Sequence, residues 1–157
     1  MKNSINFNCN LNQLNIFAKQ LANVSIPNDI FLLKGQLGSG KTTFSRLFIK
    51  ALHNNMKIIQ PKSIKSHTFP IMISYDLKKY ELYHYDFYRL KSFLELKELG
   101  IFDNFQDNIS IIEWPEILLR QKYLTSYYLI RFKIENLNLR KIKIIHTDKK
   151  LSLNIND

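Results

Sequence analysis

The sequence predicts an α/β fold in a single domain spanning residues 1–157, on the strength of three observations. A short apolar strand, a glycine-rich loop and an amphipathic helix follow one another between residues 29 and 52. A chain of 157 residues is long enough to bury one core and too short for two domains. Near the C-terminus, apolar and polar residues alternate over 128–134 and again over 140–146, which predicts an antiparallel hairpin with its polar side outward.

The glycine-rich loop is the most informative segment. Three of the four glycines lie in one eight-residue stretch, Gly-Gln-Leu-Gly-Ser-Gly-Lys-Thr, which runs from Gly35 to Thr42 and matches the P-loop pattern G-x-x-x-x-G-K-[ST]. Glycine lets the backbone approach a phosphate closely and adopt positive φ, and a helix N-terminus attracts anions. A strand over 29–33 and a helix over 43–52 flank the loop in the order that the motif needs. Lys41 is then expected to reach the phosphates, and the Thr42 hydroxyl to ligate Mg²⁺.

The other elements are predicted from caps and periodicity. Asn10 is expected to cap a first helix, and residues 54–66 to form an exposed loop. Strands are expected over 71–76, 79–86 and 109–112. Between the last two strands, a short helix is expected to begin at the capping box of Ser92 and Glu95 and to end at Gly100.

The composition of the chain limits the cellular compartments in which the protein is expected. Cys9 is the only cysteine, which excludes a disulfide framework and favours a reduced, cytoplasmic location. The N-terminus lacks the apolar region of a signal peptide, and no run reaches the roughly 18 apolar residues of a membrane span.

The formal charge of +10 has two interpretations. Eighteen of the 23 basic residues are lysines, scattered in pairs, as an AT-rich coding sequence would produce. A solvated basic surface and a patch facing tRNA or an acidic partner therefore both remain open.

Two carboxylates are candidates for the chemistry of a Mg²⁺–nucleotide site. Glu113 ends the apolar strand that begins at Ile109, as the acid of a Walker B segment does, although an ordinary exposed carboxylate at a strand end would read the same way. Asp86 shares a strand face with His84 and could hold a Mg²⁺-bound water or orient the attacking water. His84 by itself is more typical of a structural histidine than of a catalytic one. Arg89 could pair with an acid in the fold, which is favoured, or reach a phosphate.

Several other nucleotide-binding classes fit this sequence less well. The chain has neither the D-x-x-G nor the N-K-x-D segment of GTPases, and it is too short for a transporter ATPase. Nucleotide kinases clamp two phosphate groups with several arginines. This chain has five arginines in all, and only Arg46 and Arg89 lie near the motifs in sequence.

Taken together, the motifs resemble one family, TsaE, the small bacterial ATPases of threonylcarbamoyladenosine formation in tRNA. The resemblance spans about residues 11–144. The loop with its trailing Thr42-Thr43-Phe44 is similar to the family's G-x-L-G-x-G-K-T-T-F, and His84 to Leu90 is similar to its H-x-D-x-Y-R-L. Glu95-Leu96, Leu99-Gly100 and Phe105 fit its E-E-L-x-x-L-G segment and the aromatic after it, and Ile112 to Pro115 resembles its I-E-W-P.

The resemblance implies a P-loop domain with a largely parallel central sheet and antiparallel strands at the C-terminal end. It also implies slow ATP hydrolysis that supports the TsaD–TsaB complex, with tRNA reached at least indirectly. The implied phosphate-binding residues are Gly38, Ser39, Gly40, Lys41, Thr42 and Thr43. The resemblance further implies that Thr42 and Glu113 bind Mg²⁺, that Asp86 acts with Lys41 in catalysis, and that Trp114 packs at the site or at a partner surface.

One segment departs from the family pattern. The family has S-P-T-[FY]-[TN]-L in a switch-like loop near the γ-phosphate. Here Ser66 and Thr68 are kept, but His67 replaces the proline and Pro70 replaces a small polar residue. Because Pro70 removes a backbone donor and fixes φ, the ordering of this loop and the hydrolysis rate are in question. A small-molecule or nucleotide kinase and a non-hydrolysing ATP-dependent binding subunit therefore remain alternatives.

Overall fold

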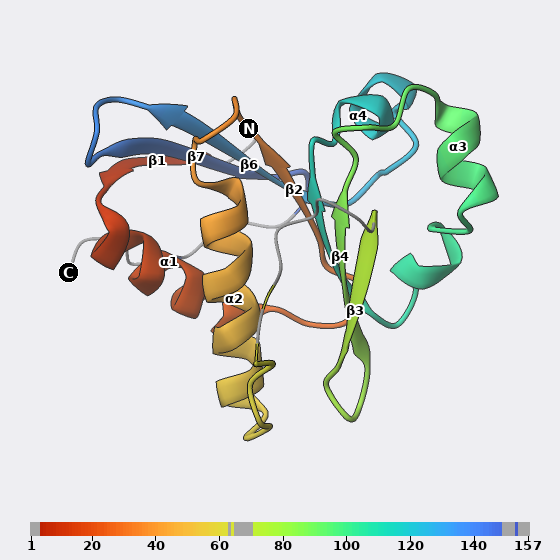
Figure 1. Ribbon diagram of the computed structural model, residues 1–157, viewed down its shortest axis with the longest axis horizontal. Coiled ribbons are helices and arrows are strands. Elements are labelled where there is room, and N and C mark those ends of the chain that lie inside the picture. The colour runs from red at the N-terminus through yellow and green to blue at the C-terminus, as the bar shows by residue number, and fades with distance from the viewer. Residues whose placement is uncertain (1–3, 63, 65–70, 149–152, 154–157) are drawn as a thin grey trace.

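The computed structural model describes residues 4–62, 64, 71–148 and 153, and its strands form one twisted sheet (Figure 1). In the described part of the chain, the strands are β1 (Ser4–Cys9), β2 (Ile30–Lys34), β3 (Met72–Asp76), β4 (Glu81–Asp86), β5 (Ile109–Glu113), β6 (Tyr128–Ile134) and β7 (Arg140–His146). Their order is β1-β7-β6-β2-β5-β4-β3. The four central strands pair in parallel, and β3, β7 and β1 pair antiparallel towards the two edges. The predicted fold class is confirmed.

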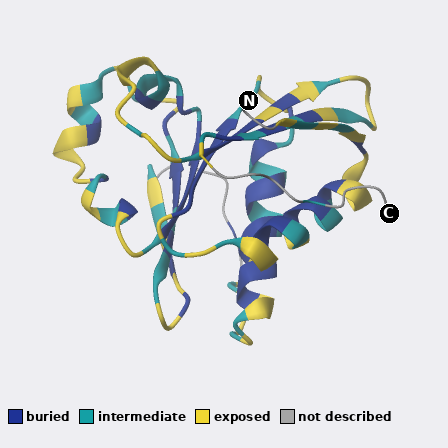
Figure 2. Cartoon of the chain, turned by 180° about the vertical axis from the view of Figure 1, so that it is seen from behind, coloured by how far each residue is buried: buried dark blue, intermediate teal, exposed yellow. Residues whose placement is uncertain are grey.

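Helices cover the two faces of the sheet unequally. The helices are α1 (Leu11–Val24), α2 (Lys41–Asn55), α3 (Phe93–Glu98) and α4 (Glu116–Gln121), with a 3₁₀ turn at Asp103–Phe105. The first two pack on one face, where they bury a core rich in phenylalanine, and the last two pack on the other face. Buried residues follow the central strands and the inner sides of α1 and α2 (Figure 2).

The predicted helix caps are confirmed. The Asn10 side chain accepts a hydrogen bond from the Gln13 backbone at 3.0 Å, and the Gln13 side chain accepts one from the Asn10 backbone at 3.0 Å. Ser92 and Glu95 form the same reciprocal pair at the start of α3. Gly100 follows that helix with a φ of +63°, a backbone conformation that glycine adopts without strain.

Two elements were not predicted. Strand β1 pairs with β7 along its whole length, so the predicted hairpin of β6 and β7 does not form the edge of the sheet. Strand β1 is hard to recognise because only one of its faces is apolar and it lies at an edge. Helix α4 has six residues, too few for a helical period to appear in the sequence.

The segment predicted as an exposed loop over 54–66 differs in part. Helix α2 continues to Asn55, and Ile59 is 92% exposed, as expected. Ile64, in contrast, is buried, and its carbonyl accepts a hydrogen bond from Arg46 Nε at 2.9 Å. Packing of this apolar residue against the core therefore holds part of the segment to α2. The predicted switch residues Ser66 and Thr68, with His67 and Pro70, lie outside the described residues.

In the part of the chain that the structure describes, no helix combines the length and the apolar character needed to cross a bilayer.

Candidate active site

The glycine-rich loop connects the carboxyl end of β2 to the amino end of α2. Gly38 and Gly40 have φ values of +74° and +106°, which glycine adopts without a steric penalty. Gly40 is the N-cap of α2, and no side chain caps this helix. Gly40 has no side chain that could accept from the first N–H groups of α2, and the positive end of the helix dipole faces the loop. This geometry suits an anion.

The first glycine of the motif serves a different purpose. A Cβ atom on Gly35 would lie 2.6 Å from the backbone oxygen of Phe132 and 2.6 Å from Ser39 Oγ. Gly35 therefore allows the loop to leave β2 directly against the backbone of β6. Its role is packing, whereas Gly38 and Gly40 supply the positive φ that sequence reasoning expected of the loop.

Lys41 is folded into the loop that it follows. Its Nζ donates hydrogen bonds to the carbonyls of Gly35 at 2.6 Å and Gln36 at 3.0 Å. The same atom lies 4.0 Å from the centre of the Trp114 ring. Burial lowers the pKa of Lys41, and the carboxylates of Glu113, Asp86 and Glu116 oppose that shift.

Trp114 is held in place by an unusual backbone. Its φ is +58°, which is rare for a large side chain and carries strain. Its N–H donates to the Leu33 carbonyl of β2, and its ring packs against Tyr88 at a centroid distance of 4.8 Å. The prediction that Trp114 packs at the site agrees with this position, where the ring contacts the charged end of Lys41.

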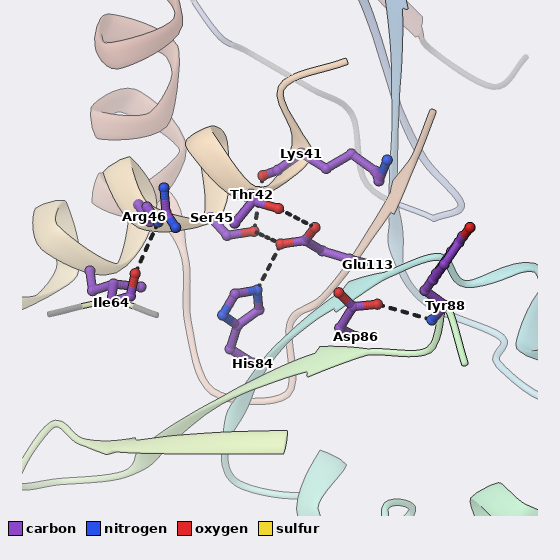
Figure 3. A network of polar contacts seen from close by, with 9 residues as sticks. All are labelled: Lys41, Thr42, Ser45, Arg46, Ile64, His84, Asp86, Tyr88 and Glu113. Atoms are coloured by element: carbon purple, nitrogen blue, oxygen red, sulfur yellow. Dashed lines mark hydrogen bonds and ion pairs between the residues drawn. The ribbon is translucent and has the colours of Figure 1, made fainter. Parts of the chain in front are cut away.

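Glu113 is the centre of a buried hydrogen-bond network (Figure 3). Its Oε2 accepts from Thr42 Oγ1 at 2.8 Å, and its Oε1 accepts from Ser45 Oγ at 3.0 Å. His84 Nε2 lies 2.9 Å from the same Oε1. Both His84 and Glu113 are buried, so the alternative of an exposed strand-end carboxylate is wrong.

The hydrogen bonds around Glu113 favour the ionised form of its carboxyl group. Burial alone raises the pKa of a carboxyl group, but the hydrogen bonds and charge of His84 and the hydroxyls of Thr42 and Ser45 outweigh it. The pKa of Glu113 is therefore held below its usual value, and the carboxylate is ionised at neutral pH. The contribution of Ser45 was not foreseen. Its spacing of four residues after Lys41, one helical turn, could have indicated it.

Asp86 lies beside Glu113 because β4 and β5 are parallel and in register at these two residues. Asp86 Oδ1 accepts a hydrogen bond from the backbone of Tyr88 at 2.9 Å. Burial raises the pKa of Asp86, and the negative charge of Glu113 adds to that rise despite the opposing hydrogen bond. A carboxylate with a raised pKa is the stronger base of the two.

These residues surround a single cavity of about 310 Å³. Its lining comprises the loop and first turn of α2, from Leu37 to Thr43, together with Asp86, Tyr88, Glu113, Trp114 and Arg140. All the described residues that the sequence singles out for phosphate, metal and catalysis are thus brought to one place.

Arg140, at the start of β7, was missed by the sequence analysis. Its Nη2 lies 3.5 Å from the Gly38 carbonyl, and its Nη1 donates to the carbonyls of Asn136 and Leu139. The expectation that only Arg46 and Arg89 are near the motifs is therefore wrong for the folded chain. Strand β7 places Arg140 beside Gly38, although the two residues are 102 positions apart in the sequence. No local sequence signal marks it.

A second cavity of about 460 Å³ adjoins the first. The two share Gly40, Thr43 and Arg140 in their linings, and the second extends between the start of α1 and the β6–β7 turn. Leu11 and Leu137 contribute exposed apolar side chains, and Asn10, Asn12 and Asn138 contribute amides. Such a mixture of apolar surface and a few polar groups is typical of small-molecule sites.

The oxygen donors at the site suit a hard cation such as Mg²⁺. The Thr42 hydroxyl and the Glu113 carboxylate are already in contact, and Asp86 is the register partner of Glu113. Among the described residues, however, no group of three or more His, Cys, Asp or Glu side chains is arranged to hold a metal ion. Mg²⁺ binding would therefore need further ligands from a bound phosphate or from water, as is usual for this ion.

The mixed sheet with its parallel centre, the strand–glycine loop–helix unit and the acids at neighbouring strand ends define an α/β protein of the P-loop type. A family model described as threonylcarbamoyl adenosine biosynthesis protein TsaE matches residues 9–144. The chain belongs to the TsaE family.

Curated relatives agree with this assignment, and a solved structure shares the fold. The tRNA threonylcarbamoyladenosine biosynthesis protein TsaE of Rickettsia felis is 42% identical over 139 residues, which cover 87% of this chain and 76% of the relative. The protein of the same name from Aquifex aeolicus is 31% identical over 127 residues, 81% of this chain and 84% of that one. The crystal structure of YdiB from Bacillus subtilis has a TM-score of 0.70 at 24% identity, over 94% of this chain and 88% of that chain, which shows a shared fold.

Proposed function

We propose that this chain binds Mg²⁺–ATP and hydrolyses it slowly, as the ATPase subunit that supports TsaD and TsaB in forming threonylcarbamoyladenosine in tRNA. The observation that carries the proposal is the convergence of Lys41, Thr42, Asp86 and Glu113 on one cavity at an uncapped helix N-terminus. We place the function in the cytoplasm, in keeping with the single free cysteine, Cys9.

In this proposal the loop holds the phosphates of ATP. Backbone N–H groups from Gly38 to Thr43 donate to phosphate oxygens, and these oxygens replace the carbonyls of Gly35 and Gln36 as acceptors for Lys41. Thr42 and Glu113 would hold Mg²⁺, and the bound ion would supply positive charge beside the phosphates. The ring of Trp114 limits the directions in which the Lys41 ammonium can point.

Asp86 is proposed to orient the water that attacks the γ-phosphate. It lines the same cavity as Lys41, and its raised pKa suits a group that accepts a proton. The hydrogen bond from the Tyr88 backbone fixes Oδ1 of Asp86. His84 acts through Glu113 and is a positioning residue.

The nucleoside of ATP is proposed to occupy the second cavity, since Gly40, Thr43 and Arg140 line both cavities. Replacing Leu11 and Leu137 together by alanine is expected to weaken ATP binding roughly tenfold, because apolar contacts with the base are lost. Binding of inorganic triphosphate should not change. Isothermal titration calorimetry with both ligands checks this, and Leu94→Ala, an exposed leucine on α3, is the control. Equal losses for both ligands would contradict the placement.

The function is tested by measuring ATP hydrolysis by the purified chain alone and then with TsaD, TsaB and tRNA. We expect turnover that rises with the partners. Asp86→Asn should lower turnover by about a hundredfold and leave ATP affinity within about threefold, because the aspartate acts on water and not on the nucleotide.

Other outcomes would favour the alternatives. ATP binding without turnover in any combination would indicate a non-hydrolysing binding subunit. Transfer of phosphate to an added acceptor, detected by product analysis, would indicate a kinase. Turnover that ignores both the partners and the Asp86 substitution would contradict the assignment of the site.

A further inference from the structure

One half of the sheet has a face that no described helix covers. Strands β1, β7 and β6 pack one face against α1 and α2, while α3 and α4 cover the other face mainly over β2, β5 and β4. Figure 1 shows α1 and α2 below β1, β7 and β6 and no helix on their opposite side. On β6 and β7, Ile130, Phe132, Ile142 and Ile144 point into the core, so the intervening residues point to the open face.

Apart from the apolar pair Leu129 and Ile145, the residues of β6 and β7 on this face are cations that lie opposite one another. On the β6–β7 pair, Arg131 is the register partner of Lys143, and Lys133 is the partner of Lys141. Across the parallel β2–β6 pair, Lys34 is the partner of Arg131. These five side chains, Lys34, Arg131, Lys133, Lys141 and Lys143, form what we call the basic sheet face.

This arrangement works against the stability of the sheet. Side chains that are directly opposite on neighbouring strands lie about 5 Å apart, and like charges there repel. Two carboxylates in the described structure contact the basic sheet face, Glu116 with Lys34 at 3.8 Å and Glu135 with Lys133 at 3.7 Å. Lys133 is 76% exposed, so its pair is weak. In the described structure Arg131, Lys141 and Lys143 have no ion pair, which favours binding of a polyanion.

We propose that the basic sheet face binds the phosphodiester backbone of tRNA directly, along a base-paired stem. The register of cations on three adjacent strands carries the proposal, and the choice of tRNA among polyanions rests on the proposed function. The open face of β6 and β7 presents no aromatic side chain, the group on which unpaired bases mainly stack, and this favours a base-paired stem over a single strand. Asn6 and Asn8, opposite Lys143 and Lys141 on β1, are exposed and add amides suited to phosphate and 2′-hydroxyl groups.

The proposal is tested by measuring how tightly the full chain binds tRNA. Binding is detected by fluorescence anisotropy at several salt concentrations. The variant combines Lys133→Gln, Lys141→Gln and Lys143→Gln. The control combines Lys19→Gln, Lys50→Gln and Lys79→Gln, which removes the same charge from exposed positions on α1, α2 and the β3–β4 turn. We expect the variant to bind tRNA at least tenfold more weakly and to lose about two units of the slope of log K against log salt, and the control to stay within threefold.

Further measurements decide between the proposal and its competitors. The proposal would be overturned if the two triple variants weakened tRNA binding equally, or if the wild type did not bind tRNA. The net positive charge of the chain would then reflect only its lysine-rich composition. Displacement of tRNA by poly-glutamate as readily as by unlabelled RNA would also overturn it, in favour of an acidic protein partner. Basal ATP hydrolysis is measured on the same preparations. Unchanged hydrolysis with weakened tRNA binding supports the proposal, and hydrolysis without any tRNA binding overturns it while leaving the proposed ATPase intact.

Discussion

Glu113→Gln is expected to lower ATP hydrolysis by at least about a hundredfold while the chain stays folded. The amide keeps the shape of the side chain, but it removes the negative charge that would hold Mg²⁺ next to Thr42. It also turns one of two acceptor atoms into a donor in a buried network in which Thr42, Ser45 and His84 all contact the carboxylate. Steady-state hydrolysis measured as a function of Mg²⁺ concentration checks the prediction.

The Mg²⁺ titration separates a role in metal binding from a role in structure. A larger Mg²⁺ requirement for Glu113→Gln, with an unchanged circular dichroism spectrum, is the expected pattern. Glu98→Gln makes the same chemical change at an exposed position on α3 and should leave turnover within about twofold. A Glu113→Gln variant with wild-type turnover and wild-type Mg²⁺ dependence would remove this residue from the proposed metal site.

Gly35→Ala is expected to reduce the free energy of unfolding by about 3 kcal/mol. The new methyl group would meet the Phe132 backbone oxygen at 2.6 Å, and a backbone atom of a central strand cannot move aside as a flexible side chain can. The loop must then shift, so we also expect weaker ATP binding. Thermal unfolding checks the prediction, with a fall in melting temperature of about 10 °C for a chain of this size.

Gly100→Ala is the matched control, because it separates a steric clash from backbone strain. Gly100 has a φ of +63° but nothing within 4 Å of an added Cβ. Its replacement should cost only the strain of the left-handed conformation, about 1 kcal/mol, without any effect on ATP binding. Equal destabilisation by the two substitutions would show that the contact between the loop and β6 is looser than the structure indicates.

Most of the helices and strands could be predicted from short-range patterns in the sequence. The cap at Asn10 and the capping box at Ser92 were predicted correctly because a cap involves residues only three positions apart. The glycine loop was recognised for the same reason, since eight consecutive residues contain its chemistry. Strand β1 was missed because a polar edge strand has little local signal, and its pairing with β7 joins residues at opposite ends of the chain.

The features of the candidate site can also be separated into those that the sequence predicts and those that only the folded structure shows. The sequence alone determined the P-loop, its flanking strand and helix, and the identity of Asp86 and Glu113 as acids at strand ends, because these features depend on short-range spacing. Only the tertiary structure decided that Asp86 and Glu113 are neighbours, that His84 holds Glu113, and that Arg140 reaches the loop. The order of strands in a sheet is set by the burial of all their faces together, and no single segment of the chain specifies it.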